Sequence, residues 1–175
     1  MAMKKTTEPA TVLLTMDVLQ QFRLIFGSMR QYFRLVEERC GLSGSQMWVL
    51  QEVARSPGLG VGDLARRMGI HQSTCSLLVD RLVAQGGVAK SRQSADQRRV
   101  GLYLGASGAE ALAKLPGPAE GILPAALAEL PEVALKTLHI NLEELIRHLP
   151  GKDESHAGTP LAEWLGPKKN KASKA

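Results

Sequence analysis

The 175-residue sequence predicts a mainly α-helical fold that carries one small β-hairpin. Apolar residues recur at steps of three and four over long stretches, and Pro- and Gly-rich breaks separate these stretches. Two short segments of strand-like composition, 88–91 and 100–104, flank a polar loop. An apolar content of 44% is enough for one domain with a real core. No apolar run approaches the ~20 residues of a membrane span, and the N-terminus lacks a secretory signal, so we expect a cytoplasmic protein that does not enter a membrane.

A long first helix is expected over residues 11–40. Its apolar side chains follow one continuous stripe, and a helix so rich in Phe and Met needs a large partner surface. Gly41 can end this helix, and Ser43 or Ser45 can start a second one that runs to Ala54. The residues of the stripe are Leu19, Phe22, Phe26, Met29, Phe33 and Val36.

Two short helices then meet at a tight turn. The third helix is expected over residues 63–68, Gly69 ends it, and a fourth helix runs from His71 to about Gln85. The fourth helix has an apolar face at the spacing i, i+3, i+4 and i+7, which would pack on the third. This arrangement, followed by the hairpin, predicts a winged helix-turn-helix over residues 41–106. The packing residues are Cys75, Leu78, Val79 and Leu82.

The C-terminal part is expected to be helical with breaks. Ser107 can cap a helix that the Pro-Gly-Pro segment 116–118 interrupts, and a last helix is expected from Pro131 to Leu149. Segments 11–40 and 107–150 would form a helical dimerisation region, packing together and against the same elements of a second chain. We expect residues 1–10 to be mobile and residues 151–175 to be a disordered basic tail, apart from a possible turn at 161–165.

Basic residues concentrate in the helix-turn-helix and the hairpin. Residues 55–99 hold eight basic and three acidic residues, whereas residues 100–150 hold three basic and six acidic ones. A positive patch on a helix-turn-helix attracts the phosphate backbone of DNA, and a merely solvated basic surface is the alternative interpretation. We therefore expect double-stranded DNA as the partner.

The expected DNA contacts come from the fourth helix and from the hairpin loop. Arg98 is expected to enter the minor groove, and Asp96 to hold the loop and orient Arg98. Phosphate contacts are expected from Lys90, Arg92 and Arg99. The exposed face of the fourth helix, whose N-terminal half would read bases, carries Gln72, Ser73, Thr74, Ser76, Leu77 and Arg81.

On these residues the sequence resembles the MarR family of bacterial transcriptional regulators, from about Thr15 to Leu149. The triplet Asp96-Gln97-Arg98 matches the D-x-R wing signature of the family. The resemblance implies a winged-helix homodimer, a palindromic operator and repression that a small molecule or an oxidant relieves. The other matching positions are Val61, Leu64, Ala65, Gly69, Ser73, Thr74, Ser76, Val79, Asp80, Leu82, Gly86, Leu102, Leu104 and Gly108.

Three features depart from the family pattern. Leu77 stands where the family often has arginine, Gly105-Ala106 replaces a Thr-containing step, and the break at 116–118 interrupts the long fifth helix. Members of this family bind aromatic acids between the dimerisation region and the winged helix-turn-helix. The resemblance therefore implies a small-molecule effector. An arginine beside aromatic rings could hold its carboxylate. The candidate effector residues are Arg23, Arg30, Tyr32, Arg34 and Trp48.

Two cysteines leave a redox alternative open. Cys75 lies on the packing face of the fourth helix, whereas Cys40, at a helix end beside Arg39, is more accessible. We therefore weigh a redox-responsive regulator that uses Cys40, and a winged-helix module for protein contacts, as alternatives to a ligand-responsive repressor. The residue spacing indicates no metal site, and we expect no catalytic residues, no enzymatic activity and no cofactor.

Overall fold

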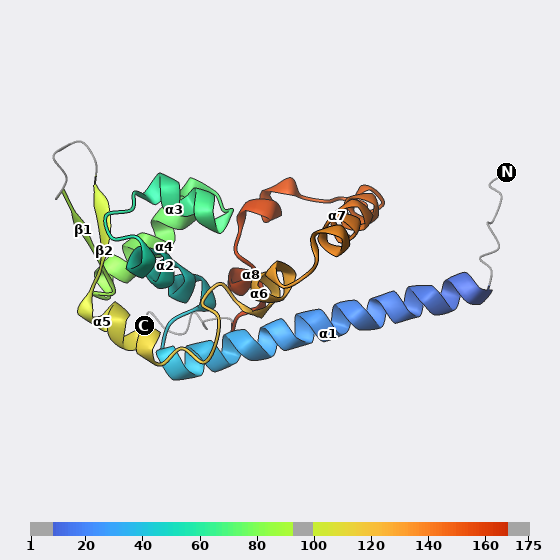
Figure 1. The fold of residues 1–175 in the computed structure, drawn as a ribbon, viewed down its shortest axis with the longest axis horizontal. Helices are drawn as coiled ribbons and strands as arrows, with labels where there is room; N and C mark the ends of the chain where they lie inside the picture. Colours follow the sequence, from blue (N-terminus) through green and yellow to red (C-terminus); the bar gives the residue numbers. More distant parts are fainter. Residues whose placement is uncertain (1–8, 93–99, 168–175) are drawn as a thin grey trace, which may run out of the picture.

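The computed structural model describes residues 9–92 and 100–167. As the sequence predicts, the chain is mainly helical with one antiparallel hairpin (Figure 1). Within the described residues, none of the helices is long and apolar enough to span a membrane. The elements are α1 (Pro9–Cys40), α2 (Gly44–Arg55), α3 (Val61–Met68), α4 (Gln72–Ala84), β1 (Val88–Ser91), β2 (Gly101–Leu104), α5 (Ala106–Ala113), α6 (Ile122–Ala128), α7 (Glu132–Arg147), the 3-10 helix η1 (Glu154–Gly158) and α8 (Leu161–Leu165).

The long helix α1 is buried only near its C-terminal end. Met29, Phe33 and Val36 are buried, whereas Leu19 and Phe26 of the same stripe are 42% and 46% exposed. Figure 1 shows the N-terminal half of α1 extending past the other elements. The predicted stripe is therefore present, but only its C-terminal half has a partner within this chain.

The main core joins α2, α3, α4 and the hairpin. Met47 and Leu50 of α2, Leu82 of α4 and Leu102 of β2 are all fully buried in this cluster. Helix α2 begins at a complete capping box, in which Ser43 Oγ accepts from the backbone N–H of Gln46 and the Gln46 side chain accepts from the backbone N–H of Ser43. This reciprocal cap fixes the direction in which α2 enters the core.

The hairpin pairs β1 with β2 in an antiparallel register that sets Val88 opposite Leu104. A third extended segment joins it at Leu59, whose carbonyl accepts from the Leu102 N–H at 3.0 Å. Val88 and Leu102 are buried and attach the hairpin to the helical core. The hairpin is thus fixed to the helix-turn-helix at its base.

The helices after the hairpin differ from the expectation in two ways. Helix α5 begins at Ala106 with Gly105 as its N-cap, so the predicted cap at Ser107 is wrong; the Ser107 hydroxyl donates instead to the Gln85 carbonyl at 2.9 Å. Helix α6 packs on α1 through Ile122 and Leu123. Helix α7, however, buries none of its residues against the rest of the described chain.

The segment after α7 is folded over most of its length. The prediction of a disordered tail is wrong for η1, whereas the turn expected at 161–165 is present as α8. Asp153 caps η1 by accepting from the Ser155 N–H at 2.9 Å. Ala162 of α8 is buried against Phe33 of α1, and this contact holds the segment on the body of the molecule.

Candidate nucleic-acid interface

The turn between α3 and α4 positions the exposed start of α4. Gly69 adopts the left-handed conformation, with φ 64° and ψ 33°, which glycine reaches without steric cost. The N–H of the next residue, Ile70, donates to the Ala65 carbonyl at 3.0 Å and closes the end of α3. The chain then turns directly into α4, whose apolar face is buried as predicted. The buried residues of α4 are Cys75, Leu78, Val79 and Leu82.

The opposite face of α4 is open. Gln72 and Ser73 are exposed, Thr74 and Ser76 are partly exposed, and Leu77 is exposed to 61%. These side chains occupy the N-terminal half of the helix, where groove-reading residues of a helix-turn-helix cluster. Within the described residues, no side chain caps the start of α4, where the backbone N–H groups carry a partial positive charge.

The basic side chains predicted to contact DNA have different surroundings. Lys90 of β1 donates to Asp80 of α4 at 2.7 Å, which ties the hairpin to the reading helix, and Arg92 is exposed. Arg81 lies 3.6 Å from the carboxylate of Glu163 in α8. Asp96, Arg98 and Arg99 lie outside the described residues.

Part of the basic excess around α3 is neutralised by local ion pairs. Arg55 and Arg67 both contact the carboxylate of Glu52, at 3.3 and 3.5 Å, and Arg66 pairs with Asp63. A count of charges in the sequence cannot show the pair of Arg67 with Glu52, because these residues are far apart in the chain and meet only when α2 packs on α3. The charge available for phosphates is therefore smaller than the sequence total.

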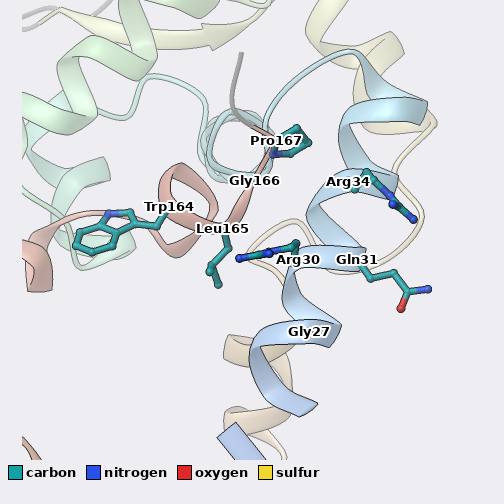
Figure 2. A pocket seen from close by; sticks show the side chains of 8 residues that line it. All are labelled: Gly27, Arg30, Gln31, Arg34, Trp164, Leu165, Gly166 and Pro167. Carbon is teal, nitrogen blue, oxygen red and sulfur yellow. The ribbon is translucent and has the colours of Figure 1, made fainter. Parts of the chain in front are cut away.

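The five predicted effector residues do not form one site. Tyr32 donates to the Pro118 carbonyl at 2.7 Å, and burial, with Cys40 and Glu120 nearby, raises its pKa to about 12. Arg23 is exposed on α1. Arg30 and Arg34 line an open hollow of about 670 Å³ between α1 and the end of α8 (Figure 2). In Figure 2, Arg30 extends toward Leu165, whereas Arg34 points away from it.

Trp48 lines a separate cavity of about 190 Å³. This cavity lies between α1, α2, the α3–α4 turn and the C-terminal segment, and its walls are mostly apolar. Ser45, at 1% exposed, contributes a hydroxyl that has no hydrogen-bond partner among the described residues. Residues 157–162 of the C-terminal segment form one wall, which sequence reasoning missed because it treated that segment as disordered.

Comparison with known proteins identifies the central region. Residues 41–99 match the sequence model of the MarR family. Over these residues the chain is similar to the MarR family. The putative transcriptional regulatory protein for the hcr operon of Thauera aromatica is 29% identical over 86 residues, which are 49% of this chain and 52% of the relative. The match thus spans about half the length of that curated relative.

Solved structures of MarR-type proteins share the fold. The MarR regulator from Oenococcus oeni PSU-1 has a TM-score of 0.53 at 17% identity, covering 74% of this chain and 98% of that one. The S. aureus MepR–DNA complex has a TM-score of 0.52 at 20% identity, covering 74% and 94%. A MepR-like protein complexed with pseudoligands has a TM-score of 0.51 at 21% identity, covering 74% and 92%. At these identities the likeness shows a shared fold.

Both thiols of the chain have a raised pKa. Burial raises the pKa of Cys75 to about 11. Burial also raises the pKa of Cys40, and this effect outweighs the opposing influence of Lys114 and Arg39. Because the thiolate is the reactive form, these shifts count against the redox alternative. Among the described residues, no three His, Cys, Asp or Glu side chains are grouped to hold a metal ion.

Proposed function

We propose that this protein is a dimeric regulator of the MarR type that binds double-stranded DNA sequence-specifically. The observation that carries the proposal is the exposed polar start of α4, presented by the Gly69 turn beside a hairpin whose base is fixed to the same core. Gln72 and Ser73 would meet base edges in the major groove, and the free N–H groups of the helix start would meet a phosphate. The wing residues Asp96, Arg98 and Arg99 would act as the sequence predicts.

The dimer is proposed from two apolar surfaces that this chain leaves open. Over its N-terminal half, α1 carries exposed apolar side chains on several sides, among them Leu13, Leu19 and Leu24. On α7, Leu145 and Ile146 are 43% and 46% exposed and share one face with Leu142. A second copy that covers both surfaces would form a two-fold dimer, and a palindromic operator would require its two reading helices to lie about 34–36 Å apart.

The cavity beside Trp48 is the effector site that we propose. Its volume of about 190 Å³ fits a single aromatic ring, and the Ser45 hydroxyl offers one hydrogen bond. Glu120 also lines the cavity, so a carboxylate there would meet a like charge. A neutral phenol therefore fits better than an aromatic acid. An aromatic acid would fit the hollow beside Arg30 instead.

Selection of bound duplexes from a random pool tests DNA binding directly. We expect an enriched palindrome, with an affinity that falls steeply as salt rises. Arg98→Ala should weaken operator binding about tenfold or more while the dimer survives, because a minor-groove guanidinium is lost. Lys136→Ala removes an exposed cation from α7 and is the matched control. No enriched sequence, or equal losses in both variants, would contradict the assignment.

Two small probes test the effector site. Phenol at millimolar concentration should release a fluorescently labelled operator, measured as a fall in anisotropy, and Ser45→Ala should weaken this response. Benzoate should act less well because of Glu120. Release by benzoate alone, abolished by Arg30→Ala, would move the effector to the hollow of Figure 2.

A further inference from the structure

The segment of residues 152–167, here named the C-terminal strap, contacts the reading helix at both ends. The His71 N–H, at the N-cap of α4, donates to the Gly158 carbonyl at 2.9 Å. Near the other end of α4, Arg81 lies 3.6 Å from the carboxylate of Glu163, which is itself only 27% exposed. The strap thus occupies one backbone donor and one guanidinium of the helix that would bind DNA.

The strap is also anchored away from α4. Ala162 is 8% exposed and packs against Phe33 of α1. A Cβ on Gly44 would lie 3.1 Å from the Ala162 Cβ and 2.7 Å from the Phe33 ring, so α8 fits closely into a notch between α1 and α2. This anchor spans the junction between the long helix and the reader, and it positions the strap without using the DNA-facing side chains.

The closed position of the strap requires glycine at 158. A Cβ at Gly158 would lie 2.1–2.6 Å from three atoms of the His71 ring, a separation that real side chains do not adopt. The backbone therefore lies directly on the imidazole, and the hydrogen bond to the His71 N–H depends on that approach. A side chain at 158 would have to displace the His71 ring, the strap or the start of α4.

The charge of the strap opposes that of the reader. Residues 152–167 hold one lysine and three carboxylates, those of Asp153, Glu154 and Glu163, whereas residues 55–99 carry a net charge of +5. The strap is attracted to the same positive surface that would attract phosphates. A DNA backbone approaching α4 would meet this negative segment and would have to displace Glu163 from Arg81.

We propose, on the basis of the DNA-binding function proposed above, that the strap is an intramolecular inhibitor of operator binding. In its closed position it holds the His71 N–H and the Arg81 guanidinium that the operator phosphates would otherwise use. Operator binding requires the strap to leave α4. The free energy needed to break the closed contacts therefore makes the binding free energy for DNA less favourable.

The strap also connects the proposed effector cavity with the reader. Residues 157–162 form one wall of the cavity beside Trp48, so that cavity is complete only when the strap is closed. A ligand that binds only the closed form stabilises it by mass action. The effector would then release the operator by holding the strap on α4, with no need for a rearrangement inside the helix-turn-helix.

Opening the strap with Gly158→Ala is the principal test, made on the full chain. We expect about five- to tenfold tighter operator binding, a coupling of ordinary size for two linked equilibria. Gly27→Ala, at a position where an added Cβ meets nothing within 4 Å, is the matched control and should leave the affinity unchanged. Hydrogen exchange at the His71 amide, protected in the wild type, should accelerate in Gly158→Ala only.

The ion pair is tested separately by Glu163→Gln. This change should tighten binding about two- to threefold at low salt and have less effect at high salt, because the lost contact is electrostatic. Glu154→Gln removes the same charge from an exposed position on the same strap and is its control. An effect of equal size in both variants would show general charge repulsion and would overturn the role of the Arg81 contact.

Weaker or unchanged binding by Gly158→Ala, with faster exchange at His71 and an intact dimer, would overturn the inhibitory role while DNA binding itself stands. If neither the wild type nor any strap variant binds a selected duplex, the DNA-binding function fails as well. The two failures are therefore distinguishable.

Discussion

Two parts of this protein differ in how far they bury their apolar residues. One is α2, α3, α4 and the hairpin, here named the reader; the other is α1 and α7, the helices proposed above to form the dimer. In the reader, α2, α3, α4 and the hairpin enclose a core in which Leu50, Leu64 and Leu82 have no exposed surface. In the dimerisation region, the N-terminal half of α1 and the whole of α7 leave their apolar side chains open. The apolar core of the reader is closed within one chain, whereas α1 and α7 leave apolar surface that we propose a second copy covers.

Because of this difference, substitutions of apolar residues should affect folding stability in the reader and association of two chains on α7. A truncated leucine in the reader should change the free energy of unfolding, because its contacts are all within the chain. A polar substitution on α7 should change association and leave the folding of a single chain nearly intact, because there is no packing to lose. The predictions below test that division, beginning with the largest expected effect.

Leu82→Ala should give the largest loss of stability. The side chain is fully buried between α4 and the hairpin, and large-to-small substitutions of this kind cost about 2–5 kcal/mol. Leu77→Ala, on the same helix but 61% exposed, should change the free energy of unfolding by less than about 0.5 kcal/mol. Urea denaturation of both variants measures the difference. Equal losses would mean that the exposed face of α4 is covered by another surface.

Leu145→Glu should break the dimer without unfolding the chain. It places a charge on the apolar face of α7 and should raise the dimer dissociation constant about tenfold or more, an effect of roughly 1.4 kcal/mol or above. Ile140→Glu makes the same change on the opposite side of α7, beside Lys136 and Glu143, and is the control. Analytical ultracentrifugation reads the association state, and circular dichroism checks that each variant remains helical. A monomeric wild type would remove the proposed interface.

The sequence predicted the reader well because its signals are local. The apolar spacing of α4, the Gly69 turn and the alternation in the hairpin are each set by neighbouring residues, and all three occur in the structure. The exposed face of α4, from Gln72 to Leu77, followed from the same periodicity. The wing residues around Arg98 stay a prediction, because they lie outside the described residues.

The strap was missed because its stability is not local. Residues 152–167 are short, polar and rich in Gly and Pro, and no helical periodicity of useful length marks them. They are held by contacts with residues far away in the chain, such as Gly158 with His71 and Ala162 with Phe33. The candidate effector residues stay a prediction, although Arg30 and Trp48 line different hollows.

High pH should destabilise the reader through Cys75. Burial raises the pKa of this thiol to about 11 in the folded state, above its ordinary value of 9.0. Between these two pH values the unfolded thiol loses its proton and the folded one keeps it, so stability falls as pH rises, by about 2 kcal/mol at pH 11. Cys75→Ala should flatten this part of the curve of unfolding free energy against pH. Cys40→Ala, at the half-exposed end of α1, should flatten it less.

Helix caps should show the smallest contrast between the two regions. Ser43 begins α2 with a reciprocal capping box inside the reader, and replacing such a cap by alanine costs about 1 kcal/mol. On α7, Thr137 donates only to the carbonyl of Val133, four residues back on an exposed helix, a bond that adds little to helix stability. Ser43→Ala should therefore lower the free energy of unfolding by about 1 kcal/mol and Thr137→Ala by less than about 0.5 kcal/mol. If Thr137→Ala proves the more costly variant at concentrations where the chain is monomeric, α7 is packed within one chain, and the division between a self-contained reader and a partner-dependent region fails.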